Sequence, residues 1–133
     1  MEPGAALADL TEISSQIEAA VLFDTAGEVA ASTVDENRAR ELVESARALL
    51  EEAERVRSGR AVLTQLEVGT PEGSVFLVRD GDRLVVATTG AEPTVGLVFY
   101  DLKTCLRNAQ PETTQKETRH ESVTKEEGED ASA

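Results

Sequence analysis

Apolar residues recur along this chain in two patterns, one with helical spacing and one of short consecutive runs. The longest helical pattern spans 36–58, and its apolar members stand three or four positions apart: Ala39, Leu42, Val43, Ala46, Leu49, Leu50, Ala53 and Val56. Such spacing places apolar side chains on one face of an α-helix. Asp35 stands at the expected N-cap, and Arg57 and Gly59 suit the end. The pattern therefore predicts one long amphipathic helix.

Two shorter segments show the same helical spacing. Residues 5–17 carry Leu7, Leu10, Ile13 and Ile17. Residues 94–108 place six apolar residues on one helical face: Val95, Val98, Phe99, Leu102, Cys105 and Leu106. Pro93 stands just before this segment, where proline is compatible with the start of a helix. The chain is thus expected to begin and end its folded part with a helix on each side of the strand runs.

Five short apolar runs predict β-strands, at residues 19–23, 28–33, 61–68, 74–79 and 83–88. The links within the first pair and within the last three contain Asp, Gly and Pro, the residues that tight turns use. Links this short favour an antiparallel arrangement. Several runs, such as 75–78 and 84–87, are apolar at three or four consecutive positions, which predicts a sheet covered by helices on both faces.

The last 24 residues differ from the rest of the chain. Residues 110–133 contain Val123 as their one large aliphatic residue, with seven acidic and three basic side chains. Such a segment buries too little apolar surface to offset the entropy of ordering. We therefore predict a folded domain at residues 1–109 and a disordered acidic tail at residues 110–133.

Charge narrows the range of partners. The chain of 133 residues has 26 acidic and 13 basic side chains and a net charge of −13, of which −9 falls on residues 1–109. An acidic surface repels phosphate backbones and anionic lipid, so nucleic-acid binding is disfavoured and a basic protein surface is the simplest complement.

No apolar run approaches the roughly 18 residues that a membrane span needs, and the N-terminal residues lack the pattern of a signal peptide. A cytoplasmic location is expected by default.

Candidate catalytic groups are few. The single histidine, His120, lies in the tail, and the single cysteine, Cys105, belongs to a core-facing helical stripe where a buried, inert thiol is expected. No Gly-x-x-x-x-Gly-Lys-Ser/Thr segment is present to bind phosphates. Asp80-Gly81-Asp82 lacks the further oxygen ligands of a calcium site and predicts a hairpin turn. The sequence predicts neither an enzyme nor a cofactor or metal site.

The order of elements and two local motifs resemble the Roadblock/LC7 family, over roughly residues 5–108. IEAAVLFDTAGEVAAS, at 17–32, resembles that family's first hairpin, in which an apolar strand enters an acidic turn that ends in Gly. GAEPTVGL, at 90–97, resembles its entry into the last helix. Two departures from the family pattern are Glu18-Ala19, where many members have Gly, and Ala26, where Asp is usual.

The resemblance implies an α+β fold of the profilin-like kind, a two-layer α/β sandwich in the order α-β-β-α-β-β-β-α with helices on both faces of a five-stranded antiparallel sheet. It also implies a homodimer, in which the third strand pairs with its symmetry mate and the two long helices lie side by side. The third predicted strand has neither Pro nor Lys, two residues that discourage pairing at an edge. The predicted dimer interface comprises Leu42, Ala46, Leu49, Ala53, Val62, Thr64 and Leu66.

Members of this family act as scaffolds and regulators, and the resemblance implies a small Ras-like GTPase as partner, which the protein would bind and regulate or anchor. The predicted partner-binding flank of the long helix comprises Glu41, Ser45, Ala48 and Glu52. Arg38, Arg40 and Arg47 are possible arginine donors to a GTPase, although pairing with neighbouring glutamates is the simpler interpretation. The alternative function is a PAS-like domain that senses a small molecule. The low aromatic fraction of 3% favours a filled core over such a pocket.

Overall fold

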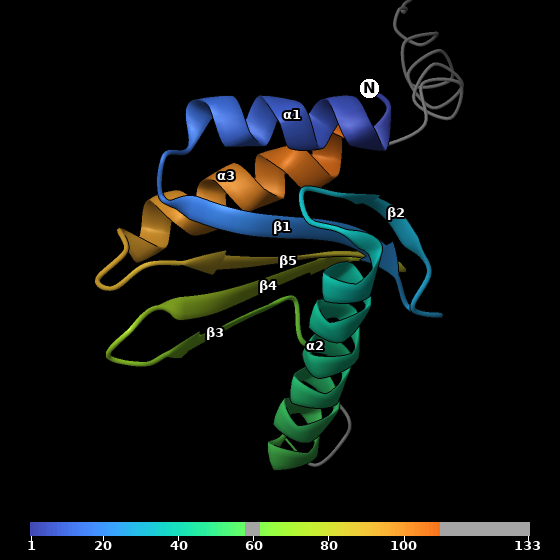
Figure 1. The fold of residues 1–133 in the computed structure, drawn as a ribbon. Coiled ribbons are helices and arrows are strands. Elements are labelled where there is room, and N and C mark those ends of the chain that lie inside the picture. Colours follow the sequence, from blue (N-terminus) through green and yellow to red (C-terminus); the bar gives the residue numbers. More distant parts are fainter. Residues whose placement is uncertain (58–61, 110–133) are drawn as a thin grey trace, which may run out of the picture.

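The computed structural model describes residues 1–57 and 62–109, so the predicted acidic tail at 110–133 lies outside the described residues. The described chain contains three helices and five strands in the predicted order (Figure 1). Their bounds are α1 Pro3–Ile13, β1 Ile17–Asp24, β2 Val29–Ser32, α2 Glu36–Val56, β3 Gln65–Gly69, β4 Ser74–Asp80, β5 Arg83–Thr89 and α3 Val95–Asn108.

All five strands form one sheet in the order β2-β1-β5-β4-β3, and every pairing is antiparallel. The β4–β5 and β1–β5 pairings are the longest, and both place apolar residues opposite one another, as where Val86 pairs with Val21 on one side and Leu77 on the other. The short strands β2 and β3 therefore form the two edges of the sheet. The five-stranded antiparallel prediction is confirmed.

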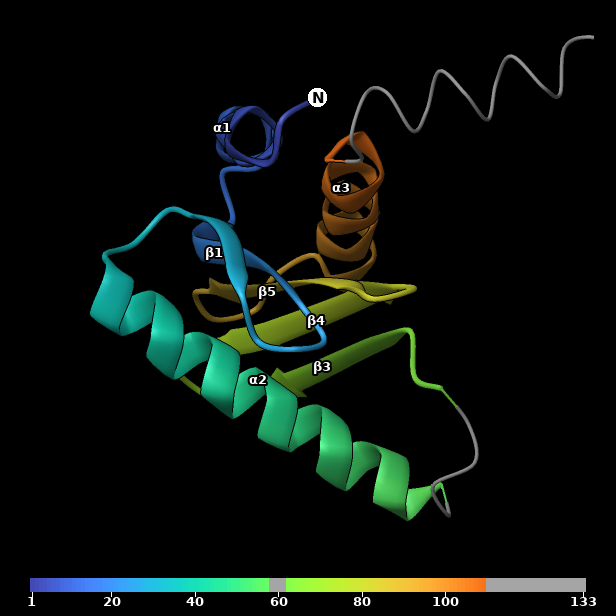
Figure 2. The same ribbon diagram turned by 90° about the vertical axis from the view of Figure 1, so that its right-hand side faces the viewer.

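Helices cover both faces of the sheet, as predicted. Helix α2 lies across one face, whereas α1 and α3 lie together over the other (Figure 2). Counted with both helical layers, the sandwich has three layers rather than two. The C-terminal turns of α2 extend beyond the sheet in both views (Figures 1 and 2).

The two faces of the sheet explain the consecutive apolar runs. Alternate residues of β1, β4 and β5 point to opposite faces, and both sets are buried. On the α1–α3 face the core contains Ala20, Leu22, Phe76, Val78, Val85 and Ala87, and on the α2 face it contains Ala19, Val21, Phe23, Leu77, Leu84 and Val86. Phe76 also meets Phe99 of α3 edge to face, with ring centroids 5.0 Å apart.

Two element boundaries differ from the predictions by more than two residues. Helix α1 ends at Ile13 because Ser14 takes an extended conformation (φ −117°, ψ 104°), so Ile17 starts β1 instead of closing the helix. Strand β3 starts at Gln65, four residues later than the pattern of apolar residues predicts. Thr64 still contributes one bond beyond the strand, because its carbonyl accepts the backbone N–H of Arg79 at 2.8 Å.

The first hairpin has the predicted turn chemistry. Gly27 has φ of +91°, a conformation that residues with a Cβ resist. Asp24 Oδ1 accepts the backbone N–H groups of Ala26 (3.0 Å) and Glu28 (2.9 Å), which fixes the turn from its first residue.

Among the described residues, no helix is long and apolar enough to cross a membrane.

Candidate protein-interaction site

The candidate interaction site is built on α2, whose start is fixed by a local cap. Asp35 Oδ1 accepts the backbone N–H of Arg38 at 2.8 Å, as the N-cap prediction requires. Its carboxylate also lies at the positive end of the helix dipole. The cap sets the position of the helix along its axis, and the apolar face sets its rotation on the sheet.

The rotation of α2 changes the role of two residues from the predicted dimer interface. Leu42 and Ala46 are buried against the chain's own sheet, in contact with the core of the α2 face. A second molecule could reach them only if α2 left the sheet. Leu49 and Ala53 lie on the adjacent flank and are half-buried, so they remain candidates for an interface.

The small residues of α2 have a similar explanation. Ala39 and Ala46 are buried under the helix, and Ala53 continues the same line one heptad later. Small side chains at these positions let α2 approach its own sheet closely. Ala48 lies on the opposite, exposed side of α2, so these alanines do not form one continuous row of small residues along which a second helix could pack closely.

The remaining predicted interface residues belong to the sheet edge. Leu66 lies in β3 and is half-buried, whereas Val62 and Thr64 precede the strand and are exposed. Val68, also in β3, is 36% exposed and pairs with Val75, so it shares the α2 face of the sheet. We call the apolar surface beside this edge the β3 margin, comprising Leu49, Ala53, Val56, Val62, Leu66 and Val68.

The β3 margin is exposed because α2 lies mainly over β2, β1 and β5, and its last turns extend beyond the sheet (Figures 1 and 2). Val56, in the last turn of α2, is 83% exposed. Strand β3 pairs with β4 on one side, and no other strand of the described residues pairs with its outer edge. An unpaired edge and exposed apolar side chains therefore occur together.

The four predicted partner-binding residues are all exposed on α2. Two of them are held by ion pairs within the helix, Glu41 with Arg38 at 3.3 Å and Glu52 with Arg55 at 2.6 Å. These exposed pairs are each worth about 0.2–1 kcal/mol and leave the carboxylates available to a partner.

The three candidate arginines differ in their contacts. Arg38 pairs with Glu41, and Arg40 pairs with Glu36 at 3.7 Å, so the simpler interpretation is confirmed for these two. Arg47 stands four residues before Glu51, a spacing that suits an ion pair on a helix. Within residues 1–57 and 62–109, however, its guanidinium makes neither a hydrogen bond nor an ion pair. It extends instead over the β1–β2 turn.

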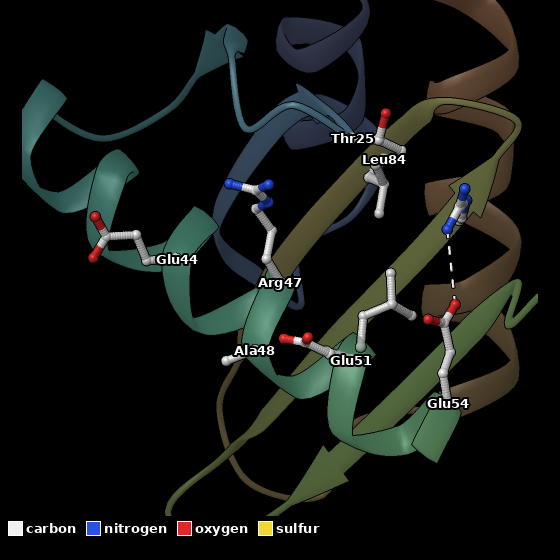
Figure 3. Close-up of a pocket in the computed structure, with 9 residues that line it drawn as sticks. Thr25, Glu44, Arg47, Ala48, Glu51, Glu54 and Leu84 are labelled. Carbon is white, nitrogen blue, oxygen red and sulfur yellow. Dashed lines mark ion pairs between the residues drawn. The ribbon is translucent and has the colours of Figure 1, made fainter. Parts of the chain in front are cut away.

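Figure 3 shows Arg47 in a cleft of about 470 Å³ between α2 and the end of the sheet. The helix supplies Glu44, Arg47, Ala48, Leu50, Glu51 and Glu54, and the sheet side supplies Thr25, Arg79 and Leu84. Arg79 Nη1 lies 3.8 Å from Glu54 Oε2 and joins the two walls through a partly buried ion pair. The cleft is polar and charged, which suits contact with a protein side chain better than an apolar ligand.

Several of these features have no local signal in the sequence. Gly27 lies directly beneath Arg47, because a Cβ built on Gly27 would stand 2.6 Å from Arg47 Nη1. The Arg79–Glu54 pair joins residues 25 positions apart. Only the fold brings these partners together, although the apolar character of Val56, Val62 and Val68 could have indicated an exposed margin once the sheet order was known.

Comparison with known proteins gives a fold. No protein-family model and no curated protein matches the sequence. Among solved structures, a Roadblock/LC7 domain from Streptomyces avermitilis is 16% identical, with a TM-score of 0.74 over 86% of this chain and 99% of that one. MglB from Myxococcus xanthus is 14% identical, with a TM-score of 0.67 over 79% of this chain and 89% of that one.

A third similar structure, described as MglB with a tetrameric arrangement, is 13% identical, with a TM-score of 0.67 over 79% of this chain and 82% of that one. At identities this low, the structural similarity supports the arrangement of helices and strands and nothing beyond it. That arrangement matches the one implied by the two sequence motifs, and the chain therefore has the Roadblock/LC7 fold.

Proposed function

We propose that this protein is a homodimeric, non-catalytic interaction module of the cytoplasm that binds a small Ras-like GTPase and regulates or anchors it. The observation that carries the dimer is the unpaired edge of β3 beside the exposed β3 margin. An exposed edge strand is a template for pairing with another strand. Two-fold pairing of β3 with β3 of a second copy satisfies both edges at once and yields a self-complementary interface.

The proposed dimer interface comprises Leu49, Ala53, Val62, Thr64 and Leu66, extended by Val56 and Val68. Leu42 and Ala46 support it from beneath by fixing α2 on the sheet. The similar MglB structure that is described as tetrameric is an assembly of the same fold, which is consistent with self-association.

The GTPase partner rests on the resemblance to Roadblock/LC7 proteins. We place it on the outer flank of α2, at Glu41, Ser45, Ala48 and Glu52, where acidic side chains suit a basic patch on the partner. If this protein donates an arginine to the GTPase, Arg47 is the first to examine, because Arg38 and Arg40 have carboxylate partners.

A sensor of small molecules is less well supported. Five of the nine residues lining the cleft of Figure 3 are charged, whereas small-molecule pockets are lined mainly by apolar side chains. The charged walls favour a protein partner.

Binding to purified GTPases of the same cell, each loaded with GDP or a GTP analogue, tests the partner directly. We expect at least one GTPase to bind, and the double variant Glu41→Lys/Glu52→Lys to weaken that binding about tenfold or more through charge reversal. Glu12→Lys on α1 is the matched control and should bind normally. The proposal fails if no GTPase binds and none changes its hydrolysis rate.

Arg47→Ala and Arg40→Ala then separate an arginine donor from a simple surface charge. Loss of stimulated hydrolysis in Arg47→Ala alone would identify a donor. Equal, unchanged rates in both variants would restrict the protein to binding or anchoring.

A further inference from the structure

A second surface, on the opposite side of the molecule, lies where α1 ends and α3 begins. Three large apolar side chains are exposed there: Ile13 is 62% exposed, Leu97 50% and Tyr100 65%. Neither β3 nor α2 contributes to this surface, which belongs to the helical layer on the other face of the sheet (Figure 2). It is therefore separate from the proposed dimer and GTPase surfaces.

Helices α1 and α3 run antiparallel, so the end of α1 lies at the same end of the pair as the start of α3 (Figure 1). Ile13 is the last residue of α1, and Leu97 and Tyr100 lie in the first two turns of α3. The other end is anchored where Cys105 Sγ lies 3.6 Å from the carbonyl oxygen of Ala6. Because the two helices are antiparallel, Ile13, seven residues after Ala6, is level with Leu97, eight residues before Cys105. A hydrogen bond of 2.6 Å from the backbone N–H of Thr94 to Gln16 Oε1 joins the same two ends.

The side of α3 that faces α1 carries Leu97, Asp101 and Cys105, which are four residues apart and so lie in one row. Cys105 contacts α1, and Leu97 is exposed at the open end. Asp101 lies between them and is only 7% exposed. Within the described residues its carboxylate has neither a hydrogen bond nor an ion pair. Neither carboxylate oxygen is fully shielded from solvent, so a cation from outside can reach this side chain.

The charged side chains near this end of the helix pair are mostly acidic. Residues 12–18 and 90–101 contain Glu12, Glu18, Glu92 and Asp101 and neither Lys nor Arg, while Lys103 follows three residues after Tyr100. An anionic membrane or a nucleic acid would be repelled by this surface. A segment with Lys or Arg beside apolar side chains would complement both its charge and its exposed apolar groups.

We propose that this end of the α1–α3 pair docks a basic amphipathic helix of a partner protein, whose apolar side chains cover Ile13, Leu97 and Tyr100 and whose Lys or Arg reaches Asp101. Helix-in-groove recognition uses this combination of apolar anchors spaced along one face and charges at the rim. The partner would bind independently of the GTPase, since the two surfaces lie on opposite faces of the sheet.

The probe is a synthetic 14-residue peptide of Leu and Lys with helical periodicity, compared with a scrambled peptide of the same composition. It is titrated into the full-length ¹⁵N-labelled protein and followed by amide chemical shifts. We expect the largest shifts in α1 and the first half of α3, with affinity falling as salt is raised. The scrambled peptide should bind at least tenfold more weakly.

Asp101→Asn preserves side-chain shape and removes the charge, so it should weaken peptide binding tenfold or more. Its melting temperature should stay close to that of the parent, because the Asp101 carboxylate makes no hydrogen bond or ion pair among the described residues that the change would remove. Tyr100→Ser should weaken binding through lost apolar contact. Glu52→Gln on α2 and Val29→Ser on β2 are matched controls that should change the affinity less than twofold.

The inference is overturned if the shifts map to α2 or β3, if Asp101→Asn binds like the parent, or if both peptides bind equally. It is also overturned if Tyr100→Ser converts a dimer to a monomer, since the surface would then be covered by a second copy. None of these outcomes depends on whether a GTPase binds α2.

Discussion

Gly73, in the turn between β3 and β4, is expected to be the least replaceable glycine of the described chain. A Cβ built on Gly73 would stand 2.2 Å from the backbone carbonyl oxygen of Thr89, whereas real Cβ contacts essentially never fall below 3.0 Å. The obstacle is backbone at the end of β5, so it cannot move aside as a side chain could. Gly73→Ala must therefore displace one strand end from the other.

The displacement would disturb two sets of bonds. The Gly73 carbonyl accepts both the backbone N–H and the side-chain hydroxyl of Thr70 at 2.8 Å, which closes the turn. Ser74, the next residue, pairs with Thr89 in the sheet. Overpacking of this kind costs about 1–3 kcal/mol, and the turn bonds add about 1 kcal/mol. A loss of about 2–4 kcal/mol lowers the melting temperature of a domain of about 100 residues by roughly 10–20 °C.

The assay is thermal unfolding of Gly73→Ala beside Gly96→Ala, followed by circular dichroism. Gly96 lies in α3. Apart from its two chain neighbours and the nearby backbone of its own helix, nothing lies within 4 Å of the position that a Cβ would take there, so alanine should raise stability by about 0.5–1 kcal/mol. A melting temperature for Gly73→Ala within 2–3 °C of the parent, judged against the roughly 4–8 °C expected per kcal/mol, would refute the close approach of the turn to β5.

Three further predictions concern other parts of the domain. Asp35→Ala removes the acceptor of the Arg38 N–H and should destabilise the protein by about 1 kcal/mol in urea unfolding; an unchanged midpoint would argue against the cap. Burial, followed by the charge of Asp9, raises the pKa of Cys105 from 9.0 to about 11. Its neutral thiol is thus favoured in the folded state, and the stability it contributes is present below pH 9 and lost as pH rises toward 11. Iodoacetamide at about pH 8 should label Cys105 only after unfolding, and rapid labelling of the native protein would contradict its burial. Deleting residues 110–133 should shift the melting temperature by less than about 2 °C, because Ala109 is the last residue of the described core and is buried. A larger fall in the melting temperature would show that the folded domain extends beyond residue 109.

Much of the fold follows from local patterns in the sequence. The helical spacing of residues 36–58, the cap at Asp35 and the turn glycine at 27 each act over a few residues, and all three are present in the structure. The consecutive apolar runs of β4 and β5 reflect burial on both faces. Short links then leave the antiparallel arrangement as the simplest way to join these strands.

The candidate site depends on distances that local patterns do not encode. An apolar stripe on a helix indicates which side chains are buried but not which neighbour covers them. The sequence was therefore compatible with Leu42 and Ala46 packing against a second helix, whereas in the structure they pack against the chain's own sheet. The Val62–Thr64 segment has strand-like composition, yet β3 begins only at Gln65. Likewise, Arg47 and Glu51 have ideal spacing for an ion pair, but the arginine extends over Gly27 in the neighbouring hairpin.

The central claim is that two copies pair through the edge of β3, and the two edge strands provide a matched comparison. Val68 of β3 and Val29 of β2 are both exposed valines at opposite edges of the sheet. Lysine is a residue that natural edge strands use against pairing. Sedimentation equilibrium of the full-length protein should show a dimer for the parent and for Val29→Lys, and a folded monomer for Val68→Lys. A parent that sediments as a monomer, or a Val68→Lys variant that remains a dimer, would contradict pairing through β3.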